Sequence, residues 1–318
     1  MVLDARALFA RSWSGGWAIL SEKPEIVIVD KALNVVGRVE IGSKPEDIAL
    51  TSDGTMLVVA DAQTLSGRSI RPSGSRWNVH GNFIGCRAAT DHIWAAEGRD
   101  DEMEVTLRDP ATGNALRTTT VADPFGGSAV MFFAHPNSTS TILWVVAGQD
   151  GQTAYLATDD GTAIRASEIP PRDRLPPVFL ADGNTYLSAG DESLEHRRWP
   201  NAECIAALPW PAASEDDQED PAGYEVEVLP GRFASWSSTN GRIYIVDLDH
   251  MRIVDELTIA GHPVRTVEEL YPTLRGDRAP CGDFGYSQLG PDGLVLTVHA
   301  RTQLVVSRLC DWSPDPAR

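Results

Sequence analysis

Acidic side chains recur at the ends of short apolar runs in this chain, and their type and spacing could support metal chemistry. Asp61 follows the run Met56–Ala60, and Glu97 follows the run Ile93–Ala96. Carboxylate oxygens that converge from several segments can hold a hard cation such as calcium. A histidine ends one further run, and the complete candidate set is Glu22, Asp61, Glu97, Asp150, Asp191 and His299.

The same residues have a second interpretation, in which they end strands and stay solvated. His299 and Gly148 interrupt the acidic series, and no asparagine-rich set accompanies it. The sequence therefore predicts no cofactor, with a calcium site as the alternative.

Motifs for catalysis are absent from the sequence. None of the seven histidines is placed as in HExxH or HxH, so the sequence does not indicate a zinc hydrolase. Gly126-Gly127-Ser128 does not form the GxSxG nucleophile elbow. There is no P-loop and no GxGxxG fingerprint after a strand. These absences favour a protein that is not an enzyme.

One basic and aromatic cluster is a candidate for protein binding. Arg197, Arg198 and Trp199 are adjacent in a polar stretch, and exposed arginine and tryptophan are enriched among binding hot spots. The alternative is that these side chains pack beneath a long loop. We treat them as candidate surface residues for a protein partner.

The elements that must position these residues are strands joined by tight turns. The stretch 53–61, which reads DGTMLVVAD, returns as DGNTYLSAGD at 182–191 and more weakly at 292–299. Strand and turn units that repeat at roughly 40 residues indicate a β-propeller, a ring of four-stranded antiparallel blades. In such a ring the acidic residues listed above would lie around the mouth of the central channel.

Aspartates after the third strand of a blade extend the pattern along the chain. Asp30, Asp109, Asp159 and Asp247 each end an apolar run and supply turn geometry. We predict one all-β propeller domain over residues 1–318, with seven four-stranded blades. Six blades are the alternative, because two blades contain weak strand segments. The last blade shows three strands, and residues 1–5 are candidates for its fourth.

Two segments depart from the repeat. Residues 213–222 are acidic without apolar periodicity, and we predict a mobile surface loop there. Residues 266–283 are predicted to be an insertion with a short helix, because Thr266 and Glu269 fit a capping box and Pro272 ends it.

Composition and charge limit the function classes. The 318 residues carry a formal net charge of -18, and an acidic surface repels nucleic-acid phosphates. No stretch reaches the roughly 18 apolar residues of a membrane helix. The start of the chain lacks the pattern of a secretory signal, and the four cysteines are widely spaced. We expect a cytoplasmic protein that is monomeric in isolation and binds neither nucleic acid nor membrane.

The stretch 42–61 resembles the repeat of YVTN and NHL-type propellers, which are related to WD40 repeats. It contains Gly42, Pro45, the Ser52-Asp53-Gly54 turn and a strand that ends in Ala60-Asp61. The chain departs from true WD40 repeats, since it has no Gly-His start and no Trp-Asp strand end. The resemblance implies a ring with a narrow channel and binding on its faces, and it implies no catalytic residues.

These observations favour a non-catalytic interaction scaffold or partner subunit, with a protein partner. One alternative is a metal-dependent hydrolase, similar to propeller lactonases, with its site on the channel axis. The other is a sensor that binds a small molecule or peptide in the channel.

Trp144 tests the assignment of an inner strand. It lies in the apolar run Ile142–Val146, which predicts a buried strand. Trp144→Ala should lower the free energy of unfolding by about 3–5 kcal/mol, as expected when a large aromatic side chain is removed from a core. Urea unfolding of both proteins measures the loss, and a value below about 1 kcal/mol would place Trp144 at the surface.

Overall fold

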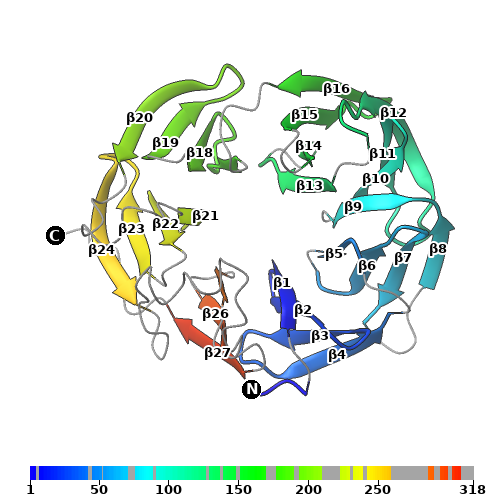
Figure 1. Ribbon diagram of the computed structural model, residues 1–318, viewed down its shortest axis with the longest axis horizontal. Helices are drawn as coiled ribbons and strands as arrows, with labels where there is room; N and C mark the ends of the chain where they lie inside the picture. Colours follow the sequence, from blue (N-terminus) through cyan, green and yellow to red (C-terminus); the bar gives the residue numbers. More distant parts are fainter. Residues whose placement is uncertain are drawn as a thin grey trace.

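The computed structural model describes a chain built from β-strands arranged as a ring (Figure 1). The residues described are 1–4, 7–41, 45–51, 53–70, 76–88, 91–126, 129–136, 139–147, 151–169, 177–189, 193–209, 223–229, 232–238, 242–258, 286–289, 294–299 and 303–308. The predicted loop at 213–222 and the predicted insertion at 266–283 lie outside these ranges.

Six antiparallel sheets have four strands each, and the strands of each sheet follow one another in chain order. The first two sheets contain β1 (Ala7–Trp13), β2 (Gly16–Ser21), β3 (Glu25–Asp30), β4 (Val35–Glu40), β5 (Asp47–Leu50), β6 (Met56–Ala60), β7 (Thr64–Ser69) and β8 (Arg76–His80). The next two contain β9 (Phe83–Ala88), β10 (Ile93–Arg99), β11 (Glu102–Arg108), β12 (Ala115–Ala122), β13 (Ala129–Ala134), β14 (Ser140–Val146), β15 (Gln152–Asp159) and β16 (Ile164–Ile169).

The fifth and sixth sheets complete the four-stranded set. They contain β17 (Val178–Phe179), β18 (Thr185–Ala189), β19 (Ser193–Arg198), β20 (Glu203–Pro209), β21 (Gly223–Val228), β22 (Phe233–Ser238), β23 (Arg242–Asp247) and β24 (Arg252–Thr258). In Figure 1 strands such as β1, β9 and β13 lie toward the middle of the ring, and β4, β8 and β24 lie at its rim.

The structure corrects the predicted number of four-stranded blades from seven to six. The last sheet has three strands among the described residues, β25 (Tyr286–Leu289), β26 (Leu294–His299) and β27 (Gln303–Arg308). The N-terminus pairs with this sheet. The amine of Met1 donates to the Leu304 carbonyl at 2.9 Å, and the Leu304 amide donates to the Met1 carbonyl at 2.8 Å. Residues from the start of the chain therefore lie beside β27.

The hydrophobic core is divided into clusters that lie between successive sheets. Trp17 and Val27 of the first sheet pack with Leu296 and Leu304 of the last. Other clusters join the first sheet to the second, the second to the third, the third to the fourth, the fourth to the fifth and the fifth to the sixth. This arrangement of repeated four-stranded sheets is that of a β-propeller.

The predicted turn aspartates end strands or follow them directly. Both carboxylate oxygens of Asp30 accept hydrogen bonds from Asn34, and these bonds lower the pKa of that carboxyl group. The Asp109 carboxylate accepts from the amides of Ala111 and Thr112 at 2.8 and 2.9 Å. These aspartates are therefore acceptors for backbone amides that the tight turns leave without a strand partner.

Two tryptophans settle where the core lies. Trp144 on β14 is only 4% exposed, which confirms its assignment to a buried strand. Trp77 lies in a polar stretch of sequence, yet it is buried on β8 and its indole nitrogen donates to the Pro110 carbonyl at 2.8 Å.

Among the described residues, no helix has the length and apolar character needed to cross a membrane.

The Trp77 ring is held between glycines of two neighbouring sheets. A Cβ atom at Gly67, on the adjacent strand β7, would overlap the indole, and so would one at Gly113 in the β11–β12 turn. Gly113 also has a φ of 73°, a backbone conformation that glycine adopts without steric cost. The turn of the third sheet can therefore approach the tryptophan of the second only without a side chain.

Gly113→Ala measures this contact, and Gly161→Ala is its matched control. Gly161 also has positive φ, at 88°, but no atom lies within 4 Å of a Cβ built there. Both variants incur the left-handed backbone cost of about 1–2 kcal/mol, whereas only Gly113→Ala also clashes with Trp77. We expect it to be less stable than the control by about 1–3 kcal/mol in denaturant unfolding. Equal losses would show that the ring moves away freely.

Candidate functional site

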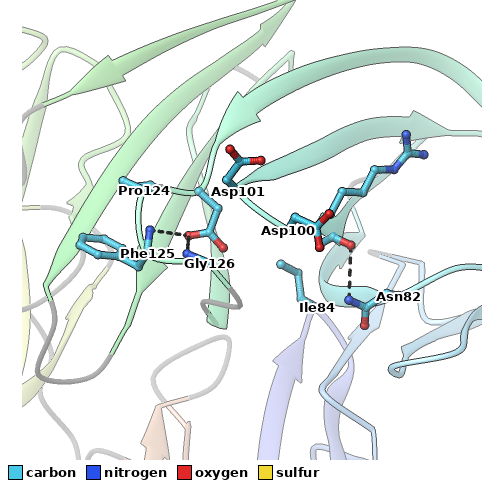
Figure 2. A pocket seen from close by; sticks show the side chains of 10 residues that line it. Asn82, Ile84, Asp100, Asp101, Pro124, Phe125 and Gly126 are labelled. Carbon is cyan, nitrogen blue, oxygen red and sulfur yellow. Dashed lines mark hydrogen bonds between the residues drawn. The ribbon is translucent and has the colours of Figure 1, made fainter.

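A pocket of about 670 Å³ opens where three connections meet. The β8–β9 connection contributes Asn82, the β10–β11 turn contributes Asp100 and Asp101, and the β12–β13 connection contributes the segment 123–126. Figure 2 shows Phe125 on one side of the pocket, Asn82 on the other, and Ile84 between them. The third sheet thus supplies most of the lining.

The β10–β11 turn presents two adjacent carboxylates. Arg99 and Glu102 pair across the ladder, so Asp100 and Asp101 form a two-residue turn between them. Asp100 has a φ of 48°, a left-handed conformation that aspartate tolerates better than most residues. Both aspartates are exposed, and within the described chain neither carboxylate has a hydrogen-bond or ion-pair partner. Their negative charge is available to a ligand.

Arg99 also lines the pocket, but its charge is already engaged. Its guanidinium lies 2.9 Å from the Glu104 carboxylate and 3.7 Å from that of Glu97. Both glutamates are on the same hairpin, which keeps the cation beside the strands. The pocket therefore stays electronegative although it contains an arginine.

The opposite wall is a tight turn that presents an aromatic ring. The buried carboxylate of Asp123 accepts from the amides of Phe125 and Gly126, both at 3.2 Å. Phe125 is half-buried, and its ring lies close to Gly151, which directly precedes β15. Asn82 donates from its side chain to the Gly98 carbonyl at 3.3 Å. The wall opposite Asn82 is therefore an ordered turn that includes Pro124 and Phe125.

This arrangement can bind a cation that has an apolar stem. Carboxylates at a pocket rim attract ammonium and guanidinium groups. Phe125, Pro124 and Ile84 offer the kind of apolar surface along which the methylene chain of lysine or arginine can lie. The chemistry of the pocket is binding of a basic side chain.

The predicted acidic ring is described only in part. Glu22 is exposed directly after β2, Asp61 directly follows β6, and Glu97 lies within β10 beside the pocket residue Gly98. His299 ends β26, and its side chain lies outside the described part of the structure, as do Asp150 and Asp191. Across the described residues, no group of three histidine, cysteine, aspartate or glutamate side chains could hold a metal ion.

The Asp61 carboxylate accepts hydrogen bonds from the β6–β7 turn in which it lies. Its carboxylate accepts from the amides of Gln63 and Thr64 at 2.8 and 2.6 Å, and from the Thr64 hydroxyl at 3.2 Å. The backbone carbonyl of Asp61 accepts from Phe83 of the next sheet at 3.2 Å. This residue therefore holds the β6–β7 turn against β9.

The predicted basic cluster makes several contacts within the fifth sheet and its neighbour. Arg197 forms an ion pair with Glu195 and donates to the Ala202 carbonyl at 2.8 Å. Trp199 is half-buried with its ring centroid 5.1 Å from that of Phe179 and 6.1 Å from that of Tyr186. Arg198 is exposed and lies 2.9 Å from Glu203. Arg198 is thus the most accessible member of the cluster.

Sequence reasoning missed the residues that line the pocket. Asp100 and Asp101 form a tight turn, a position where acidic residues usually have only a local role. Phe125 follows Asp123-Pro124, which indicates a turn and not a binding wall. The one available signal was the run Arg99-Asp100-Asp101-Glu102, which places two adjacent carboxylates in one turn.

Comparisons with known proteins support the fold. No protein-family model matches the chain, and no curated protein matches it. A solved chain described as Kuenenia stuttgartiensis hydrazine synthase aligns over 98% of this chain and 97% of its own length, with a TM-score of 0.60 and 16% sequence identity. A likeness at this identity shows a shared fold alone, and it fits the repeated four-stranded sheets of a β-propeller.

Asp61 and calcium provide a test of the acidic ring. We expect calcium to leave the melting temperature unchanged, because the Asp61 carboxylate already accepts three hydrogen bonds. Asp61→Ala should cost about 1 kcal/mol through lost turn bonds, and Asp61→Asn should cost less because it keeps one acceptor oxygen. Thermal unfolding with and without calcium measures both effects. A calcium-dependent rise that disappears in Asp61→Asn would instead establish a cation site.

Proposed function

We propose that this chain is a non-catalytic interaction module, in which the pocket between the β10–β11 turn and the β12–β13 connection takes a basic side chain of a partner protein. We further propose that its repeats belong to the YVTN and NHL type, which the stretch 42–61 resembles. The protein partner, the monomeric state and the cytoplasmic location are parts of the same proposal.

The observation that carries the proposal is the pair Asp100 and Asp101. Their carboxylates are exposed at the rim of a pocket, and neither has a partner within the described chain. Two carboxylates in one turn concentrate negative charge at the pocket rim, where a cation can form ion pairs with them. Such a pair is better suited to a guanidinium or ammonium group than to any anion.

The framework around the pair supports recognition of a partner. The third sheet is packed on both sides, because separate hydrophobic clusters join it to the second and the fourth sheets. A turn on a rigid sheet binds with a small entropic cost, since little needs to be ordered on association. The net charge of -18 also favours the approach of a basic partner and disfavours nucleic acid.

The other two functions are separated from this one by direct measurements. A metal-dependent hydrolase requires a cation site, and part of its candidate set, Asp150 and Asp191, lies outside the described residues. The calcium experiment above addresses it. A small-molecule sensor would bind free arginine as tightly as it binds a basic peptide, whereas an interaction module needs the wider contact of the peptide.

The test uses fluorescence anisotropy with labelled hexa-arginine as the probe and hexa-glutamate as the negative peptide. We expect Asp100→Asn with Asp101→Asn to weaken hexa-arginine binding at least about tenfold, or about 1.4 kcal/mol. The matched control is Asp255→Asn with Glu256→Gln, which removes two adjacent exposed carboxylates from the outer strand β24. Affinity should fall as salt rises, because the interaction is between charges near the surface.

The control pair separates a local site from general attraction. If both double variants weaken the peptide equally, then hexa-arginine responds only to the net charge, and the pocket is not the binding site.

A further inference from the structure

Arg87 is a cation without a counterion on the inner strand β9. Its side chain is half-buried, and the described part of the structure gives it no hydrogen bond, ion pair or ring contact. None of its nitrogens is among the fully enclosed polar atoms without a partner, so part of the guanidinium remains in contact with solvent. Burial lowers the pKa of Arg87 to about 10, which leaves it charged at neutral pH.

The other arginines that are not exposed show that the lack of a partner at Arg87 is unusual. Among the described residues that are not exposed, each remaining arginine donates to an oxygen. Arg68 donates to the Glu40 carbonyl, Arg108 to the Gly113 carbonyl, Arg117 to Asp159, and Arg197 to Glu195. A partly desolvated charge is costly unless it is paired. Arg87 therefore incurs a desolvation cost that hydrogen bonds or ion pairs offset at the other four arginines.

Among the described residues, no side chain close to Arg87 accepts a hydrogen bond from it. It lies directly opposite Trp94 in the β9–β10 ladder, so the two side chains share one face of the sheet. Trp94 is fully buried, and the ring of His92 meets it edge-on at 5.9 Å. The nearby carboxylate of Asp91 is used by His92, whose Nδ1 lies 2.6 Å from it. Arg87 thus shares its sheet face with Trp94, and the described residues place no carboxylate within ion-pair distance of its guanidinium.

We propose that Arg87 is the anchor of an anion site that takes an oxyanion group, carboxylate or phosphate, of a small molecule. The planar fork of arginine can donate two parallel hydrogen bonds to such a group. The site is separate from the acidic pocket. Ile84 lines that pocket at the start of β9, and Arg87 lies three residues further along the strand, about 10 Å away in extended chain.

The charge of the whole molecule makes the proposal selective. A net charge of -18 repels anions at long range, so an anion gains only from local contact with Arg87. Added salt screens the long-range repulsion. The measurement must therefore be made at constant ionic strength.

Thermal unfolding with sodium acetate and with inorganic phosphate, balanced by sodium chloride, tests the site. A ligand that binds only the folded protein raises the melting temperature by mass action. We expect a rise of about 2 °C or more at saturating anion, lost in Arg87→Met. Without added anion, Arg87→Met should melt at or above the wild-type temperature, because it removes an unpaired charge and keeps most of the volume.

Two further variants isolate the role of the fork. Arg87→Lys keeps the charge but not the paired donors, so its anion response should be smaller than that of the wild type. Arg252→Met removes an exposed arginine of β24 and should leave the response unchanged. A larger response to acetate assigns the site to carboxylates, and a larger response to phosphate assigns it to phosphate groups.

The opposite results would overturn the proposal. If Arg87→Met melts well below the wild type and neither anion stabilises the wild type, then Arg87 has a packing role only. Neither result bears on the basic-peptide test, because that test depends on Asp100 and Asp101 at the other end of the hairpin.

Discussion

Packing between the faces of successive sheets is the constraint on which the rest of the structure depends. Each described hydrophobic cluster is shared by two neighbouring sheets, so no sheet buries its apolar faces alone. The first and last sheets share a cluster too, and Met1 hydrogen-bonds to Leu304 beside it. Without that contact two apolar faces would be open to water. Local packing of blades and the joining of the chain ends are therefore one problem.

The inner strands are also tied by a buried charge. The Asp47 carboxylate on β5 accepts from the Cys86 amide of β9 at 3.2 Å and lies 3.4 Å from the Arg11 guanidinium of β1. Burial raises the pKa of Asp47, and these contacts oppose that rise. Burial of the Cys86 side chain, with the Asp47 carboxylate nearby, raises the pKa of its thiol and keeps it protonated and unreactive. One carboxylate thus joins the first three sheets close to β9, the strand that carries Arg87 and contributes Ile84 to the acidic pocket.

The sequence predicts this fold well where a local rule determines the structure. Asp30 and Asp109 end strands because their carboxylates accept the amides of their own turns, and Trp144 is buried because its run is apolar. The sequence predicts the structure less well where contacts between distant segments determine it. The burial of Trp77 depends on Gly113, which is 36 positions away and offers no side chain. The number of four-stranded sheets depends on which segments pair, and composition does not determine pairing.

The candidate sites were missed for a related reason. Asp61 and Asp101 both lie in the turn between the second and third strands of a sheet, yet the sequence pattern indicates only Asp61, because it directly follows an apolar run. In the structure Asp61 accepts three hydrogen bonds from its own turn, whereas the Asp101 carboxylate accepts none from the described chain. Arg87 and Arg108 differ in the same way, since only Arg108 finds acceptors.

The charged side chains that a ligand can bind are therefore those that the fold itself does not pair or hydrogen-bond. Many acidic side chains in the described part of the chain accept turn amides, as Asp30 and Asp109 do, or pair with arginines, as Asp159 does. For a partly buried charge such as Arg87 the lack of a partner is informative, because desolvation is costly unless the charge is paired. The charged groups of the two proposed sites, Arg87 and the pair Asp100 and Asp101, lie at opposite ends of one hairpin, β9–β10 with its following turn. The third sheet is thus the part of the ring where binding is best supported by the physical chemistry of its own residues.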